Sequence, residues 1–104
     1  MLGILFKKEI NCRFTDAENT ACIMCNHVLE NDRPILLVTH DMDDGMWQFL
    51  CGANGHDSHD IRIVSLLDAT NIDAHIDELC EMPIGTGATR ESIDDDWKPY
   101  KLES

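Results

Sequence analysis

The sequence predicts an α+β fold, with a small, mostly antiparallel sheet and one or two short helices. Two observations carry this prediction: short runs rich in β-branched residues lie before residue 66, and a helical period begins after residue 71. Strands followed by a helix in this order are typical of α+β folds. A chain of 104 residues is expected to form one globular domain, residues 1–104.

The clearest sheet signal is a hairpin formed by residues 35–51. Its first arm is rich in β-branched residues, and its second arm places Trp47, Phe49 and Cys51 on one face. An acidic turn that ends at Gly45 separates the two arms. The alternation predicts that Trp47 lies in the core.

Two further strands are predicted at residues 21–25 and 61–65, which are short and apolar or alternating. Asn71 is predicted to cap a helix that Pro83 ends. The apolar positions of this helix are Ile72, Ile76, Leu79 and Cys80. The segment 85–88, Gly-Thr-Gly-Ala, lacks the Lys-Ser/Thr of a phosphate-binding loop and is interpreted as a turn that lets backbones pack closely.

The chain is strongly acidic, with a net charge of −12. Between Pro34 and Ala88 the only Lys or Arg is Arg62. Such a surface repels nucleic-acid phosphates and anionic lipids and attracts basic proteins. We therefore expect neither nucleic acid nor membrane as a partner. Arg90, one of few cations, is expected to pair with a carboxylate inside the protein.

Cysteine usage and the first residues favour a cytoplasmic protein. Five cysteines, an odd number, argue against a disulfide framework, and we expect most of them to be buried thiols. The first eight residues are apolar and then basic, the reverse of a secretory signal. No apolar run approaches the roughly 20 residues that span a bilayer.

Cys22-x-x-Cys25 is the candidate metal motif, because Cys51 and either His56 or His59 would complete four ligands for tetrahedral zinc. The strand argues against convergence of the two thiols, since positions i and i+3 point to opposite faces. The alternative is two unligated thiols on a half-buried strand. A thioredoxin-like redox motif is disfavoured, because the residues after Cys25 do not resemble a helix N-terminus.

Two other polar segments contain residue types that take part in metal binding or catalysis. The histidines and carboxylates of residues 56–60 suit a divalent metal or acid–base catalysis with His40, but a solvated loop is the favoured interpretation. The acidic turn is not a calcium-binding EF-hand loop, because Gly52 stands where the twelfth-position Glu belongs when Asp41 is the first position. No catalytic residue is assigned.

The leading functional hypothesis is a non-enzymatic interaction protein that binds a basic partner protein, with no cofactor. The alternative is a zinc-binding protein that uses Cys22, Cys25, Cys51 and either His56 or His59. The residues expected to contact a partner are Asp41, Asp43, Asp44, His56, His59 and Trp97.

Several segments together resemble an uncharacterised bacterial family, part of which is immunity-protein-like. The segment 43–52 matches an Asp-x-Gly-x-Trp-x-Phe-x-x-Gly stretch, and 63–66 and 83–91 match an Ile-Val-x-Leu strand end and a Pro-x-Gly-x-x-Ala-x-Arg-Glu segment. Similarity extends over residues 15–100. The resemblance implies a small bacterial protein without assigned catalytic residues, and for some relatives the neutralisation of a toxin, which would be a basic partner here.

Overall fold

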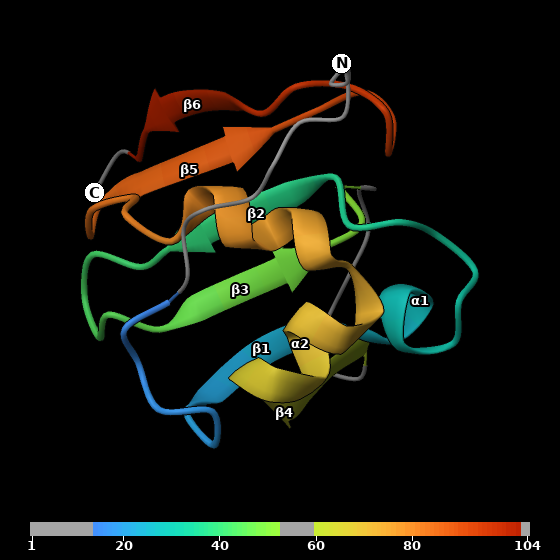
Figure 1. Cartoon of the computed structure of the whole chain (residues 1–104), viewed down its shortest axis with the longest axis horizontal. Coiled ribbons are helices and arrows are strands. Elements are labelled where there is room, and N and C mark those ends of the chain that lie inside the picture. Colours follow the sequence, from blue (N-terminus) through green and yellow to red (C-terminus); the bar gives the residue numbers. More distant parts are fainter. Residues whose placement is uncertain (1–13, 53–59, 103–104) are drawn as a thin grey trace, which may run out of the picture.

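The computed structural model describes residues 14–52 and 60–102, which form one six-stranded sheet with helices packed against it (Figure 1). The strand order is β4-β1-β3-β2-β5-β6. The strands are β1 (Ala21–Cys25), β2 (Leu37–His40), β3 (Trp47–Leu50), β4 (Ile61–Ser65), β5 (Thr86–Thr89) and β6 (Lys98–Lys101). The fold is therefore α+β, as the sequence predicts.

Every neighbouring pair of strands is antiparallel except β1 and β3, which run parallel. The predicted hairpin is present as β2 and β3, with Val38 opposite Phe49 and His40 opposite Trp47. Gly45 closes its turn at a φ of 72°, a backbone conformation that glycine adopts without strain. In the strand order, β3 lies between β1 and β2. After β1 the chain therefore passes first to β2 and then returns as β3, directly beside β1.

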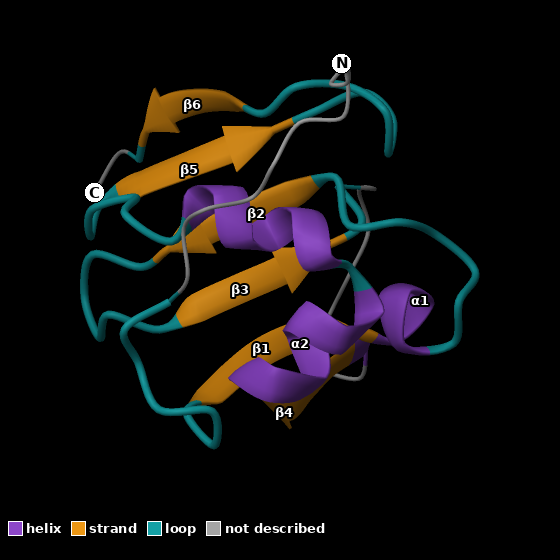
Figure 2. Cartoon of the chain, viewed as in Figure 1, coloured by secondary structure: helices purple, strands orange, loops and turns teal. Residues whose placement is uncertain are grey.

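Three short helices lie over the same face of the sheet (Figure 2). They are α1 (Asn26–Leu29), α2 (Leu66–Ile72) and the 3₁₀ helix η3 (Ala74–Leu79). The helix expected to start at Asn71 was placed wrongly. Ser65 caps α2 by accepting a hydrogen bond from the Asp68 N–H. The extended backbone at Asp73 then ends α2, and the Asp73 side chain caps η3 by accepting from the His75 N–H. No helix in the described ranges is long and apolar enough to span a membrane.

The core lies between the sheet and these helices. Phe49, Met24 and Val38 are fully buried on the covered face of the sheet, and Ile76 is buried from η3. The prediction for Trp47 is confirmed: 2% of its surface is exposed, and its ring stacks on His40 at 3.9 Å. Burial of these side chains supplies the main driving force for folding.

Arg90 is buried and pairs with Asp73, as expected of an internal cation. Its Nε donates to the Ile35 carbonyl, and its guanidinium lies 4.1 Å from the centre of the Trp97 ring. The Trp97 indole N–H donates to the His75 carbonyl. These contacts of Arg90 connect the end of β5 to the helical layer. The buried positive charge of Arg90 is stabilised because its hydrogen-bond and ion-pair partners surround it.

The Gly-Thr-Gly-Ala segment is part of strand β5 rather than only a turn. Gly85 forms the turn, with a φ of 88°, and Gly87 lies beneath the ring of Tyr100. A Cβ at residue 87 would lie 2.7 Å from the Tyr100 ring. The close packing expected for the segment is therefore present, between two strands.

Candidate metal centre

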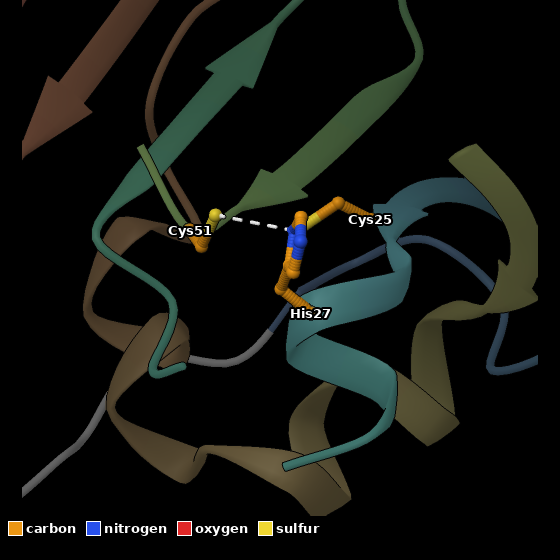
Figure 3. Close-up of side chains that lie close together, drawn as sticks. All are labelled: Cys25, His27 and Cys51. Carbon is orange, nitrogen blue, oxygen red and sulfur yellow. Dashed lines mark hydrogen bonds between the residues drawn. The ribbon is translucent and has the colours of Figure 1, made fainter. Parts of the chain in front are cut away.

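Three side chains of the types that can ligate a metal converge beside the ends of β1 and β3: Cys25, His27 and Cys51 (Figure 3). One ligand atom from each lies within 4.8 Å of the other two. Cys25 and Cys51 were predicted as zinc ligands from the sequence, whereas His27 was not. This is the one such group found among residues 14–52 and 60–102.

Parallel pairing explains why the two cysteines meet. Cys25 is the last residue of β1, and Cys51 directly follows the last residue of β3. Met24 lies opposite Phe49, so the two strands end at the same edge of the sheet. The carboxyl ends of parallel strands are a common position for ligand sites in sheets with helical layers, because the chain leaves the sheet there.

Helix α1 brings His27 to the two thiols. It begins directly after Cys25, its N-cap, and Val28 anchors it in the core. The expectation that the residues after Cys25 do not start a helix was therefore wrong. The Glu30 N–H donates to the Asn26 carbonyl and the Asp32 N–H to the His27 carbonyl, so one turn folds the chain back over the strand end. A helical turn of four residues is too short to be evident from propensity.

The spacing of the ligand atoms is close to what zinc requires. Ligands about 2.0–2.3 Å from a tetrahedral ion lie roughly 3.5–3.8 Å apart. The Cys51 Sγ and the His27 Nδ1 are 3.9 Å apart (Figure 3). The widest separation in the group is within 4.8 Å, so a contraction of about 1 Å would bring all three atoms onto one ion.

Burial distinguishes the thiols from the imidazole. Cys25 is fully buried and Cys51 is 3% exposed, and neither forms a disulfide. His27 is half-buried, so the imidazole is the ligand nearest to solvent. Two buried thiols beside a more accessible imidazole form a donor set of soft and borderline ligands, which suits zinc better than calcium or magnesium.

Cys22 does not join this group. Its Sγ lies 3.6 Å from the Thr20 carbonyl, on the buried face of β1. Burial and, to a smaller extent, the negative charge of Asp16 raise the pKa of the Cys22 thiol to about 11. A thiol of this kind keeps its proton, so Cys22 has the properties of a small core residue.

Three of the cysteines, Cys22, Cys25 and Cys51, are buried and form no disulfide, which agrees with the expectation of mostly buried thiols. Cys80 differs, because it forms a disulfide. His56 and His59, expected either to ligate zinc or to contact a partner, lie outside the described residues.

The acidic turn uses its carboxylates partly to hold its own shape. The Asp41 side chain accepts from the Asp43 N–H, and the Asp44 side chain accepts from the Met46 N–H. Asp43 and Asp44 are nevertheless exposed at the tip of the hairpin. Trp97, the remaining predicted contact residue, is half-buried over Arg90.

An acidic hollow lies on the helical side of the molecule. Its volume is about 110 Å³, and its apolar part is formed by Phe14, Leu66 and Leu67. Thr70 and the side chains of Asp16, Glu18 and Asp77 complete the lining. Carboxylates beside an apolar surface suit a cationic group on an apolar stem, such as a lysine side chain.

Comparison with protein-family models, with curated proteins and with solved structures gave no match to this chain. The resemblance to an immunity-protein-like family thus stays a prediction from the sequence.

Proposed function

We propose that this chain is a zinc-binding protein in which Cys25, His27 and Cys51 supply three of the ligands. The observation that carries this proposal is the convergence of one ligand atom from each residue within 4.8 Å. The residues come from β1, α1 and the segment after β3, so the convergence is a property of the fold and not of one short sequence motif.

The chemistry of the donors favours zinc among the common divalent ions. Zinc is held in proteins by cysteine thiolates and histidine nitrogens, usually four in a structural site. Calcium and magnesium prefer oxygen ligands, which this group does not contain. His56 and His59, five and eight residues after Cys51, remain the sequence's candidates for a fourth ligand.

The role that we propose for the ion is structural. Zinc at this position would join the end of β1, the short helix α1 and the residue after β3. A helix of one turn gains little stability from its own hydrogen bonds, so coordination of an ion by a residue of α1 would add to the stability of this helix. Because structural zinc binding is coupled to folding, the ion would stabilise the domain against unfolding.

The test is a zinc titration of the reduced protein against a chromophoric chelator, with single cysteine variants. We expect one ion per chain for the wild type and for Cys22→Ser, and loss of tight binding in Cys25→Ser. Cys22 is the matched control, since it lies on the same strand and is equally buried. Absence of binding in the reduced wild type, or equal binding by Cys25→Ser, would overturn the proposal.

A second proposed function is binding of a basic partner protein, as in an immunity role in the cytoplasm. Two features support it: the exposed carboxylates of Asp43 and Asp44, and the acidic hollow beside Leu67. Acidic surfaces steer basic proteins and accelerate their association. The zinc site and this role are compatible, because an ion that rigidifies the fold leaves these surfaces free.

Charge reversal tests the second function. A basic partner recovered from the source cell with the wild type should associate at least about 10-fold more slowly with Asp43→Lys/Asp44→Lys at low salt. Its association should also depend less on ionic strength. Arg62→Ala, which removes an exposed cation from another strand, is the control for general surface change. An unchanged association rate would remove the hairpin tip from the proposed surface.

A further inference from the structure

Two of the proposed zinc ligands are thiols that lie close enough to react with each other. The sulfurs of Cys25 and Cys51 belong to the group whose ligand atoms all lie within 4.8 Å of one another. Both side chains point toward the His27 imidazole (Figure 3). A disulfide needs the two sulfurs about 2.05 Å apart, so side-chain rotation has to close a gap of at most about 2.8 Å. The two thiols therefore have a second chemistry besides metal binding.

The pairing of β1 with β3 also sets the two backbones at a suitable separation. Met24 lies beside Phe49 in the parallel register. One residue further along, Cys25 falls beside Leu50, and Cys51 is the next position. A strand separation of about 4.8 Å and a rise of about 3.3 Å per residue place the two cysteine Cα atoms roughly 6 Å apart. Disulfides join Cα atoms about 4.4–6.8 Å apart, so the strands need not separate or slide.

The same geometry excludes Cys22 from such a bond. Cys22 lies three residues before Cys25 on β1, which is roughly 10 Å along an extended strand. The register places it beside Trp47, four residues before Cys51, which is roughly 13 Å along β3. Both separations exceed the range that a disulfide spans. Among these three buried cysteines, the fold therefore selects one pair.

Binding of zinc would make the two thiols reactive in spite of their burial. A thiol that coordinates a metal ion is deprotonated, and the thiolate is the form that hydroperoxides oxidise. Cys51 is 3% exposed and Cys25 is fully buried, so a small oxidant reaches Cys51 first. Cys25 is then the neighbouring thiolate that reacts with the oxidised sulfur.

We propose that Cys25 and Cys51 form a redox switch, in which a hydroperoxide such as hydrogen peroxide joins them in a disulfide and releases the zinc. This inference rests on the proposed zinc site and states how that site is regulated. The Cys51 thiolate attacks one peroxide oxygen, the O–O bond breaks, and a sulfenic acid and hydroxide form. The Cys25 thiolate then attacks the Cys51 sulfur, which forms the S–S bond and expels a second hydroxide. Two electrons pass from the sulfurs to the peroxide, and two protons from solvent convert the hydroxides to water.

Oxidation changes which segments are held together. The disulfide keeps β1 joined to the residue after β3, but neither sulfur remains a thiolate that can bind zinc. His27 is then no longer linked to the two sulfurs through the ion. Helix α1, which has four residues, loses the stabilisation that coordination adds. Reduction of the disulfide should restore both zinc binding and the stability of α1.

Peroxide treatment of the zinc-loaded protein tests this inference. A chromophoric chelator too weak to remove zinc from the untreated protein should report the release of one ion per chain. A phosphine reductant should then restore zinc binding. Cleavage at acidic residues, of which Glu30 and Asp41 lie between the two cysteines, places Cys25 and Cys51 on separate peptides. Mass spectrometry should find these peptides linked in the oxidised wild type and in Cys22→Ser, and separate in Cys25→Ser.

Three results would overturn the switch. Zinc could stay bound after peroxide treatment, or leave without a link between the two peptides. The link could also persist in Cys25→Ser and disappear in Cys22→Ser, which would assign the bond to Cys22. The first two readouts use the wild type alone and do not depend on how a variant folds. Failure of the zinc site itself is distinct, because it is seen before peroxide is added, as a reduced protein that binds no zinc, and it would remove both proposals.

Discussion

Cys22 and Cys25 lie on the same strand, are both fully buried and are both free thiols, yet their surroundings differ. Cys22 lies inside strand β1, opposite Val64 of β4, and contacts a backbone carbonyl. Cys25 ends its strand and faces His27 and Cys51. Burial alone makes a thiol unreactive, whereas a position at the end of parallel strands brings it to other ligands.

The difference follows from how the chain leaves the sheet. Inside a strand, neighbouring backbones fix the direction of each side chain. At Cys25 the strand ends and α1 begins, so side chains from three segments approach one point. The comparison predicts that changes at Cys25, His27 and Cys51 act through metal binding, and that changes at Cys22 act through packing and protonation.

The largest expected effect is loss of stabilisation by zinc in Cys51→Ser. A ligand at about 1,000 times its dissociation constant stabilises the folded state by about 4 kcal/mol, and loss of a buried thiolate should remove most of this increment. Thermal unfolding with zinc and with a chelator measures the difference for the wild type and for the variant. A melting temperature of the wild type that is the same in both conditions would contradict the assignment.

Replacement of His27 should have the next largest effect on metal binding. His27→Gln keeps a polar side chain of similar size but removes the imidazole, so zinc affinity should fall by more than the roughly 10- to 100-fold that loss of an outer-shell group costs. His75→Gln, at an exposed histidine of η3, is the control. If both variants bind zinc as the wild type does, His27 is not a ligand.

Cys22→Ala should leave zinc affinity unchanged and reduce the free energy of unfolding by about 1 kcal/mol, because it leaves a small cavity in the core. Chemical denaturation and the zinc titration, carried out on the same protein, separate the two quantities. A loss of zinc affinity comparable to that of Cys25→Ser would mean that Cys22 joins the ligands, and the comparison between the two thiols would fail.

The last expected effect concerns alkaline pH. The pKa of the Cys22 thiol rises from an ordinary value of 9.0 to about 11 in the folded protein, mainly because of burial. Between these values the unfolded chain loses a proton that the folded protein retains, so stability should fall as the pH rises from about 9 to about 11. Denaturation across this range should show a shallower fall for Cys22→Ala than for the wild type. Identical slopes would contradict the assigned pKa.

Local patterns in the sequence predicted the parts of the fold that depend on local contacts. The hairpin of β2 and β3 and the buried position of Trp47 follow from alternation around a glycine turn. The helix boundary was missed because Ser65 and Asp73 compete with Asn71 as caps, and only packing selects between them. Strands β5 and β6 were missed because Gly87 has low strand propensity and is held by Tyr100.

The candidate site was predicted in part for the same reason. Cys25 and Cys51 were chosen by residue type, but their approach depends on parallel pairing of β1 and β3, which sequence spacing does not indicate. His27 follows Cys25 by two residues, and this Cys-x-His spacing was the available signal. This spacing indicates a shared site only in the structure, where α1 places the His27 imidazole beside the Cys51 thiol.

The central claim is that Cys25, His27 and Cys51 bind one metal ion together. The most direct measurement is the absorption spectrum of the reduced protein titrated with Co²⁺, which occupies zinc sites and reports thiolate ligation and tetrahedral geometry. We expect thiolate charge-transfer bands and intense visible bands that saturate at one ion per chain in the wild type and Cys22→Ser, and that disappear in Cys51→Ser. A featureless spectrum for the wild type, or an unchanged spectrum for Cys51→Ser, would contradict the claim.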